Sequence, residues 1–184
     1  LARAVDARRA EVRALGALGV DLAYLGRGDE GLAQLRLALQ RAEENGVPED
    51  LSRAYAWITD VLTMLGRPRE SARLGQQAYE VIRGYGMGST LLVTNRIEAL
   101  LAIGDWDKAD ELSTAALGGI ASSFSYWLLT IRADLDIGRG DFTAARAHLD
   151  AAGATLPRDH DQGRYDTRLA ELALWERRWT DADA

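Results

Sequence analysis

Apolar residues recur along this chain at steps of three and four, the spacing that places side chains on one face of an α-helix. The clearest stripe runs from Leu51 through Tyr55, Ile58 and Leu62 to Leu65. Strand-like alternation is not sustained anywhere, so the pattern predicts an all-α fold. Four further stripes comprise Leu15, Leu18, Leu22 and Leu25; Leu92, Val93, Ile97, Leu100 and Leu101; Phe124, Leu128, Ile131 and Leu135; and Tyr165, Leu169, Leu172 and Ala173.

Turn sequences divide these helices into pairs. Each turn is a six-residue segment that ends on a small residue, because two closely crossing helices leave no room for a longer side chain. The small residues lie 38, 38, 36 and 37 residues apart and are Ala33, Ser71, Ala109, Ala145 and Ala182. Such a period is typical of solenoids in which each helix pair packs only on its neighbours. We therefore predict a right-handed superhelical solenoid of antiparallel helix hairpins with a period of 36 to 38 residues.

Residues that stop and start helices place the repeat boundaries. The Asn-Gly-Val-Pro segment at 45–48 ends a helix, Pro68 suits a first helical turn, and Ser89 or Thr90 can cap the next helix. Repeats are expected at 8–46, 49–86, 89–120 and 122–156, with an incomplete fifth at 161–184. Residues 1–6 would complete a preceding hairpin, so we expect a fragment of a longer chain. Aromatic side chains expected to fill the closed ends of three hairpins are Trp106, Phe142 and Trp179.

The turns around Trp106 and Phe142 resemble those of the tetratricopeptide repeat. A further alanine follows the small residue by seven positions in three repeats, at Ala78, Ala116 and Ala152. The period here is longer than that repeat's 34 residues, and the large aromatic residue expected four positions after the small one is absent. The resemblance is therefore to a degenerate, lengthened variety of the repeat.

The amino-acid sequences of segments 16–26, 95–100 and 172–176 resemble the helical-repeat region of the large ATP-binding LuxR-family regulators, the MalT-like group. This resemblance implies a nucleotide-binding domain before the repeats and a helix-turn-helix after them. The repeats would then bind an inducer or a partner protein. Similar repeats also follow ATPase domains in some nucleotide cyclases.

Composition limits the partners that this chain can take. It has 184 residues and a formal net charge of -6, with basic residues spread along the chain rather than gathered in one stripe. Nucleic-acid binding needs concentrated positive charge, so we expect no direct contact with DNA. Cysteine is absent. No apolar run approaches the roughly 20 residues of a bilayer span, and we expect a cytoplasmic protein without membrane contact.

Catalytic chemistry is not indicated by any cluster of residues. There is no Gly-x-x-x-x-Gly-Lys phosphate loop, and the only histidines are His148 and His160. The adjacent residues of 159–161 cannot all point at one metal ion. The acid pairs at 43–44 and 49–50 have no convergent partner, so a solvated loop explains them. We expect no enzymatic activity, no metal and no cofactor.

A candidate binding surface follows from helix geometry. At 100° per residue, the side chains opposite the core stripes form the concave inner face of a solenoid. They mix Trp, Tyr and Arg with acids and an amide, which interfaces favour as anchors. The predicted site residues are Arg53, Trp57, Asp60, Asn95, Glu98, Tyr126, Thr130, Arg164 and Glu171. Alternatively, these residues only cover the inner surface.

Two functions stay open from the sequence. The first is a sensor or scaffold solenoid of a large ATP-dependent LuxR-family transcriptional regulator, in which the groove holds a protein, a peptide or an inducer. The resulting change in curvature would pass to the flanking domains of the same chain. The second is a peptide-binding or assembly module of another multidomain signalling protein, without a transcriptional role. In either role, Asn95 falls where tetratricopeptide clamps commonly place an amide that grips a peptide backbone.

Overall fold

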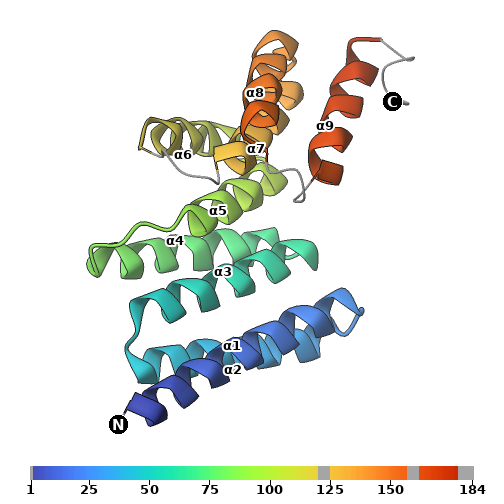
Figure 1. Cartoon of the computed structure of the whole chain (residues 1–184). Helices are drawn as coiled ribbons and strands as arrows, with labels where there is room; N and C mark the ends of the chain where they lie inside the picture. The colour runs from blue at the N-terminus through green and yellow to red at the C-terminus, as the bar shows by residue number, and fades with distance from the viewer. Residues whose placement is uncertain (1, 120–124, 157–161, 178–184) are drawn as a thin grey trace. The chain divides into compact units, whose positions relative to one another are not determined.

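The computed structural model describes residues 2–119, 125–156 and 162–177. Within them the chain is all-α, as predicted, and contains no strand. It divides into two compact units, residues 1–104 and 105–184, which we describe separately. The helices in chain order are α1 (Ala2–Tyr24), α2 (Gly28–Asn45), α3 (Pro48–Met64), α4 (Pro68–Gly84), α5 (Thr90–Ile103), α6 (Trp106–Gly119), α7 (Ser125–Arg139), α8 (Phe142–Thr155) and α9 (Gln162–Trp175) (Figure 1).

The helix boundaries follow local chemistry. The α2 helix ends at Gly46 in the left-handed conformation, and proline occupies the first positions of α3 and α4. Ser89 caps α5, with its hydroxyl accepting a hydrogen bond from the Leu92 N–H at 3.4 Å. These three predictions are confirmed. Four glycines with φ between +71° and +83° precede the second helix of each pair, and they are Gly26, Gly66, Gly104 and Gly140.

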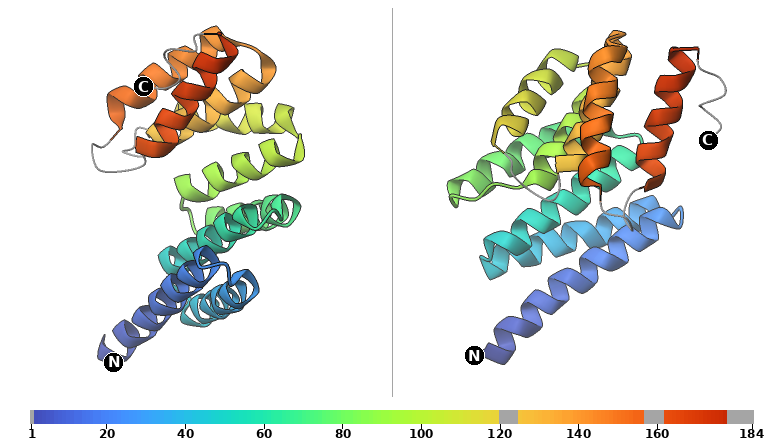
Figure 2. Two further views of the ribbon diagram at one scale, coloured as in Figure 1. Left: turned by 90° about the vertical axis from the view of Figure 1, so that its right-hand side faces the viewer. Right: turned by 45° about the horizontal axis from the view of Figure 1, so that its top comes forward.

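In the N-terminal unit, consecutive helices pack side by side, and α3 also contacts α1 and α5 (Figure 2). The stripe predicted for α3 is its buried face, since Leu51, Tyr55, Ile58 and Leu62 are all buried. Two apolar clusters fill the spaces between α1, α2, α3, α4 and α5. Neighbour-on-neighbour packing of this kind is consistent with a helical-repeat architecture.

The first helix crossing corrects the predicted register. Ala33 is exposed, whereas Gly31 is buried between α1 and α2. A Cβ atom on Gly31 would lie 2.5 Å from the carbonyl oxygen of Gly19, so only glycine fits. The prediction fails by two residues because Gly26, rather than Gly28, is the left-handed turn residue. At the corresponding positions of later pairs, Ser71, Ala109 and Ala145 are fully buried as expected.

The α1 helix packs through small residues rather than through the predicted leucine stripe. Its buried residues are Val12, Gly16, Gly19 and Ala23, whereas Leu18 is 48 % exposed and Leu25 is 76 % exposed. The stripe prediction is wrong here because it counts only large apolar residues, whereas glycines let α1 and α2 approach each other closely. The helix is also continuous from Ala2, so residues 2–6 do not form the end of a separate helix.

The C-terminal unit has its core between α7, α8 and α9. The buried cluster contains Ala133, Ile137, Ala145, Leu149 and Leu172, with Phe142, Tyr165 and Leu169 packed at its edge. Trp106 is less buried than predicted, at 38 % exposure. Its ring lies over Gly138 of α7, where a Cβ atom would approach it to 3.0 Å. Trp179 and Ala182 lie outside the described residues.

Candidate functional site

The nine residues predicted to form one concave face fall into both units. Arg53, Trp57 and Asp60 lie on α3, and Asn95 and Glu98 lie on α5, all in the N-terminal unit. The C-terminal unit holds the other four, which are Tyr126 and Thr130 on α7 and Arg164 and Glu171 on α9. Two subsets can therefore be judged, each within its own unit.

Asn95 is a core residue that joins α5 to α3. It is 7 % exposed, and its side-chain N–H groups donate to the Ala56 carbonyl oxygen at 2.9 Å and to the Thr59 hydroxyl at 3.0 Å. Both amide hydrogens are thus used inside the protein. The expectation that Asn95 faces away from the core is wrong, and its donors are not free to grip a peptide backbone.

Trp57 contributes to packing against α1. A Cβ atom on Gly16 would lie 1.9 Å from the Trp57 ring, so the indole rests directly on the α1 backbone. The Arg53 guanidinium carbon is 6.0 Å from the ring centroid, at the outer limit of a cation–π contact. Asp60 and Glu98 are half-buried and have interaction partners. The expectation that Trp57 is not needed for burial is therefore wrong.

The residues of the C-terminal subset are also partly structural. Tyr126 and Thr130 are buried, and the Thr130 hydroxyl donates to the Tyr126 carbonyl oxygen at 2.8 Å. The Arg164 guanidinium carbon lies 4.8 Å from the centroid of the Trp127 ring. Glu171 is half-buried and accepts a hydrogen bond from Arg168 at 2.9 Å. Exposure was wrongly expected for Tyr126 and Thr130, because their face of α7 is covered.

A small crevice adjoins these residues in the C-terminal unit. It has no room for a water molecule, and its lining residues are Tyr126, Trp127, Thr130, Leu156, Arg164 and Tyr165. Burial raises the pKa of the Tyr165 hydroxyl, with the charges of Asp150 and Asp166 adding to the effect. The phenol is therefore neutral at physiological pH. The aromatic side chains fill this crevice, so it is not a binding pocket.

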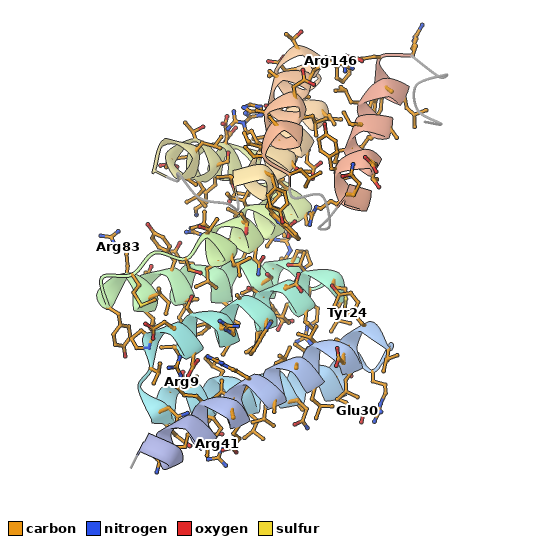
Figure 3. All side chains as sticks on the ribbon, in the orientation of Figure 1. Arg9, Tyr24, Glu30, Arg41, Arg83 and Arg146 are labelled. Carbon is orange, nitrogen blue, oxygen red and sulfur yellow. The ribbon has the colours of Figure 1, made fainter. Side chains whose placement is uncertain are left out.

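One predicted solvated acid is part of the core. Asp50 is 1 % exposed, and its carboxylate accepts a hydrogen bond from the Arg9 Nε at 2.8 Å. This ion pair connects α1 to α3, and Arg9 is labelled between them in Figure 3. The solvated-loop interpretation is wrong for Asp50, and residues 43, 44 and 49 are exposed as expected but belong to helices α2 and α3 rather than to a loop. The 159–161 segment lies outside the described residues.

An open hollow on α4 is a further candidate site that the sequence did not reveal. Gln76, Tyr79, Glu80, Arg83 and Gly84 line it, and its volume is about 500 Å³. The four side chains follow helical spacing, so they share one face of α4. Arg83 projects from the end of this helix in Figure 3. We call this region the α4 hollow.

Arg96 of α5 lies beside the α4 hollow. It is 8 % exposed, and its Cβ atom covers Gly75 of α4, at 3.3 Å from where a glycine Cβ would stand. It interacts electrostatically with Tyr79 and Glu80, which line the hollow. Burial lowers the pKa of Arg96 from its usual value, while the neighbouring charges oppose this effect. No hydrogen bond or ion pair joins Arg96 to any other residue that the structure describes.

The burial of Arg96 could have been predicted from its position in the apolar stripe of α5. This residue lies four residues after Leu92 and four before Leu100, so it occupies the buried face of α5. A charged residue on an apolar stripe is unusual, because arginine is almost never fully buried without a partner. By contrast, nothing in the sequence indicated the hollow itself.

No protein-family model matches this chain, and no curated protein matches its sequence either. The fold therefore defines only a broad class, an all-α protein consistent with helical-repeat architecture. Among the described residues, no helix is long and apolar enough to cross a membrane. The same part of the chain holds no group of three His, Cys, Asp or Glu side chains placed to bind a metal ion.

Proposed function

We propose that this chain is a non-catalytic binding scaffold, built as a right-handed superhelical solenoid of tetratricopeptide-like hairpins. One recurring geometry carries the proposal. In four helix pairs, a glycine with positive φ is followed five residues later by a buried small residue, as with Gly66 and Ser71 or Gly140 and Ala145. Repeated helix pairs of the same structure create extended surfaces for partners, whereas catalysis needs one specialised set of residues.

Within this proposal, the chain is the sensor region of a large ATP-dependent LuxR-family regulator in the cytoplasm. The support is the resemblance of segments 16–26, 95–100 and 172–176 to the repeats of that group. The repeats bind a protein, a peptide or an inducer, and they pass the resulting change in curvature to the flanking domains. Direct contact with nucleic acid or membrane is not part of this role.

An assembly module without a transcriptional role is the second candidate. The exposed Leu18 of α1, and Leu25 just after that helix, lie 40 residues before the more buried Ile58 of α3 and Leu65 just after it. The Leu65 side chain packs onto the start of α2, since a Cβ atom on Gly28 would lie 2.6 Å from it. The outer face of α1 thus presents, at matching positions, apolar side chains like those that α3 uses for stacking.

Activity measurements on the purified chain test the scaffold proposal. We expect no ATP hydrolysis and no shift of duplex DNA at physiological salt, because the sequence contains neither a phosphate loop nor a basic stripe. Either activity would contradict the proposal. The neighbouring coding sequence separates the two candidates, since a helix-turn-helix of about 60 residues downstream is expected only for the regulator.

A further inference from the structure

Arg96 is a buried charged residue without a hydrogen-bond or ion-pair partner in the part of the chain that the structure describes, which is rare in folded proteins. A buried charge loses its hydration, and this loss is normally offset by an ion pair or by hydrogen bonds. Asp50, the buried acid of the same unit, has such a partner in Arg9. Arg96 has neither an ion pair nor a hydrogen bond within the described residues, although it is more than nine-tenths buried.

The polar end of Arg96 reaches accessible surface. Its nitrogens are not among the buried polar atoms that are closed off from solvent without a partner. The stem, in contrast, is packed against Gly75 of α4. The guanidinium therefore reaches solvent, and it interacts electrostatically with Tyr79 and Glu80, which line the α4 hollow.

The charges around the α4 hollow leave an excess of positive charge. Among the described residues that line it, Glu80 is the only acid, and it accepts a hydrogen bond from the Gln76 amide. Arg83, which lines the hollow, and Arg96, which interacts electrostatically with Glu80 and Tyr79, carry two positive charges against this one. Since the whole chain has a net charge of -6, anions gain nothing from its overall field, and any attraction must be local to this site.

We infer that the α4 hollow binds a small organic anion whose carboxylate or phosphate group pairs with the Arg96 guanidinium. The planar fork of a guanidinium matches the two oxygens of either group and forms strong charge-assisted hydrogen bonds with them. Arg83 adds a second positive charge to the lining, and the Tyr79 ring offers an apolar wall for the rest of the molecule. This site is independent of whether the chain belongs to a regulator.

Titrations of the whole chain with succinate and with inorganic phosphate test this inference. Ionic strength is held constant with sodium chloride, and binding is followed by calorimetry and by the melting temperature. We expect a saturable rise in melting temperature with at least one anion, because a ligand that binds only the folded state stabilises it. The anion that binds with the higher affinity identifies the acidic group that the site prefers. The inference would be overturned if the melting temperature changed no more than it does in chloride alone, or did not change up to about 50 mM of either anion.

Three variants locate the anion. Arg96→Met keeps the length of the stem, removes a costly buried charge, and should weaken binding about tenfold to hundredfold. Glu80→Gln removes a repelling charge and should tighten binding about two- to fivefold. Arg36→Met, the same substitution at an exposed arginine of α2, should bind like the parent. Unchanged binding by Arg96→Met, or weaker binding by Glu80→Gln, would place the anion elsewhere.

If Arg96→Met does not fold, Arg96→Lys replaces it. Lysine keeps the charge but lacks the fork, so the affinity for the better anion should still fall, whereas a purely structural arginine would leave affinity unaltered. The parent titration decides the existence of the site in either case.

Discussion

At the scale of single residues, glycine sets the closest helix contact in the N-terminal unit. Gly19 and Gly31 face each other where α1 crosses α2, and neither position has room for a Cβ atom. Hydrophobic periodicity could not find this contact, because it counts large apolar side chains and treats glycine as a gap. For the same reason it missed Gly16, on which Trp57 rests.

Substitution at this crossing provides a first prediction. Gly31→Leu should lower the free energy of unfolding by about 1 to 3 kcal/mol, because the added side chain forces α1 away from α2. Ala33→Leu, two residues along the same helix, should change it by less than about 0.5 kcal/mol, since Ala33 is exposed. Urea denaturation of both variants measures the difference. Equal losses would show that the register is wrong.

Trp57 leads to a second prediction at this scale. Trp57→Ala should destabilise the protein by about 2 to 4 kcal/mol, because it leaves a cavity over Gly16. Tyr85→Ala serves as the control, since that ring is 53 % exposed and should matter little. If thermal denaturation shows Trp57→Ala to be as stable as the parent, the indole is free for a partner after all.

At the scale of helices, equivalent positions have different surroundings. Ile58 of α3 is buried against its neighbours, while Leu18, 40 residues earlier on α1, is exposed. The sequence could predict the stripes of α3, α5, α7 and α9, because large apolar residues mark them. It could not distinguish a stripe that another helix covers from one that stays open, since both have the same composition.

A matched pair of variants tests this difference. Ile58→Ala should cost about 2 to 5 kcal/mol of unfolding free energy, as for other buried large-to-small substitutions. Leu18→Ala should cost less than about 1 kcal/mol, because only part of that side chain leaves water on folding. Guanidinium denaturation of the two variants gives both values. A large loss for Leu18→Ala would mean that the outer face of α1 is covered in solution.

Ion pairs that join α6 to α7 predict a pH dependence of stability. Hydrogen bonds from Arg139 and Arg132 hold the pKa of the Asp110 carboxyl below its usual value of 3.8. Because the folded pKa is the lower one, this group stabilises the fold above pH 3.8 and loses that effect as pH falls further. Asp110→Asn should therefore be less stable than the parent at pH 7. Thermal melts should show this gap closing as the pH falls below 3.8, and a constant gap would exclude the ion pair as its source.

At the scale of the whole molecule, the two units follow from local packing. The N-terminal unit contains α1 to α5 and the contacts among them. The sequence could predict helix pairs along the chain, because turn glycines, prolines and caps act locally. The candidate site was predicted poorly, since buried polar residues such as Asn95 and Arg96 look like surface residues until their neighbours are known.

A pair of truncations tests the autonomy of the first unit. Residues 1–104 should fold alone with helical circular dichroism and a cooperative thermal transition, because this piece keeps its own core. Residues 1–84 lack α5 and should melt at a lower temperature, since the partner that Asn95 supplies to α3 is then missing. If the longer piece melts without cooperativity, the division into units does not hold in solution.

The glycines of α1 also affect the order in which the N-terminal unit folds. Gly16 and Gly19 each disfavour helix by about 1 kcal/mol relative to alanine, which weakens the helix that this segment can form alone. The packing of α2 and Trp57 against its bare backbone offsets this loss. Folding should therefore begin among the later helices, with α1 joining last, and unfolding should start with the departure of α1 from the stack.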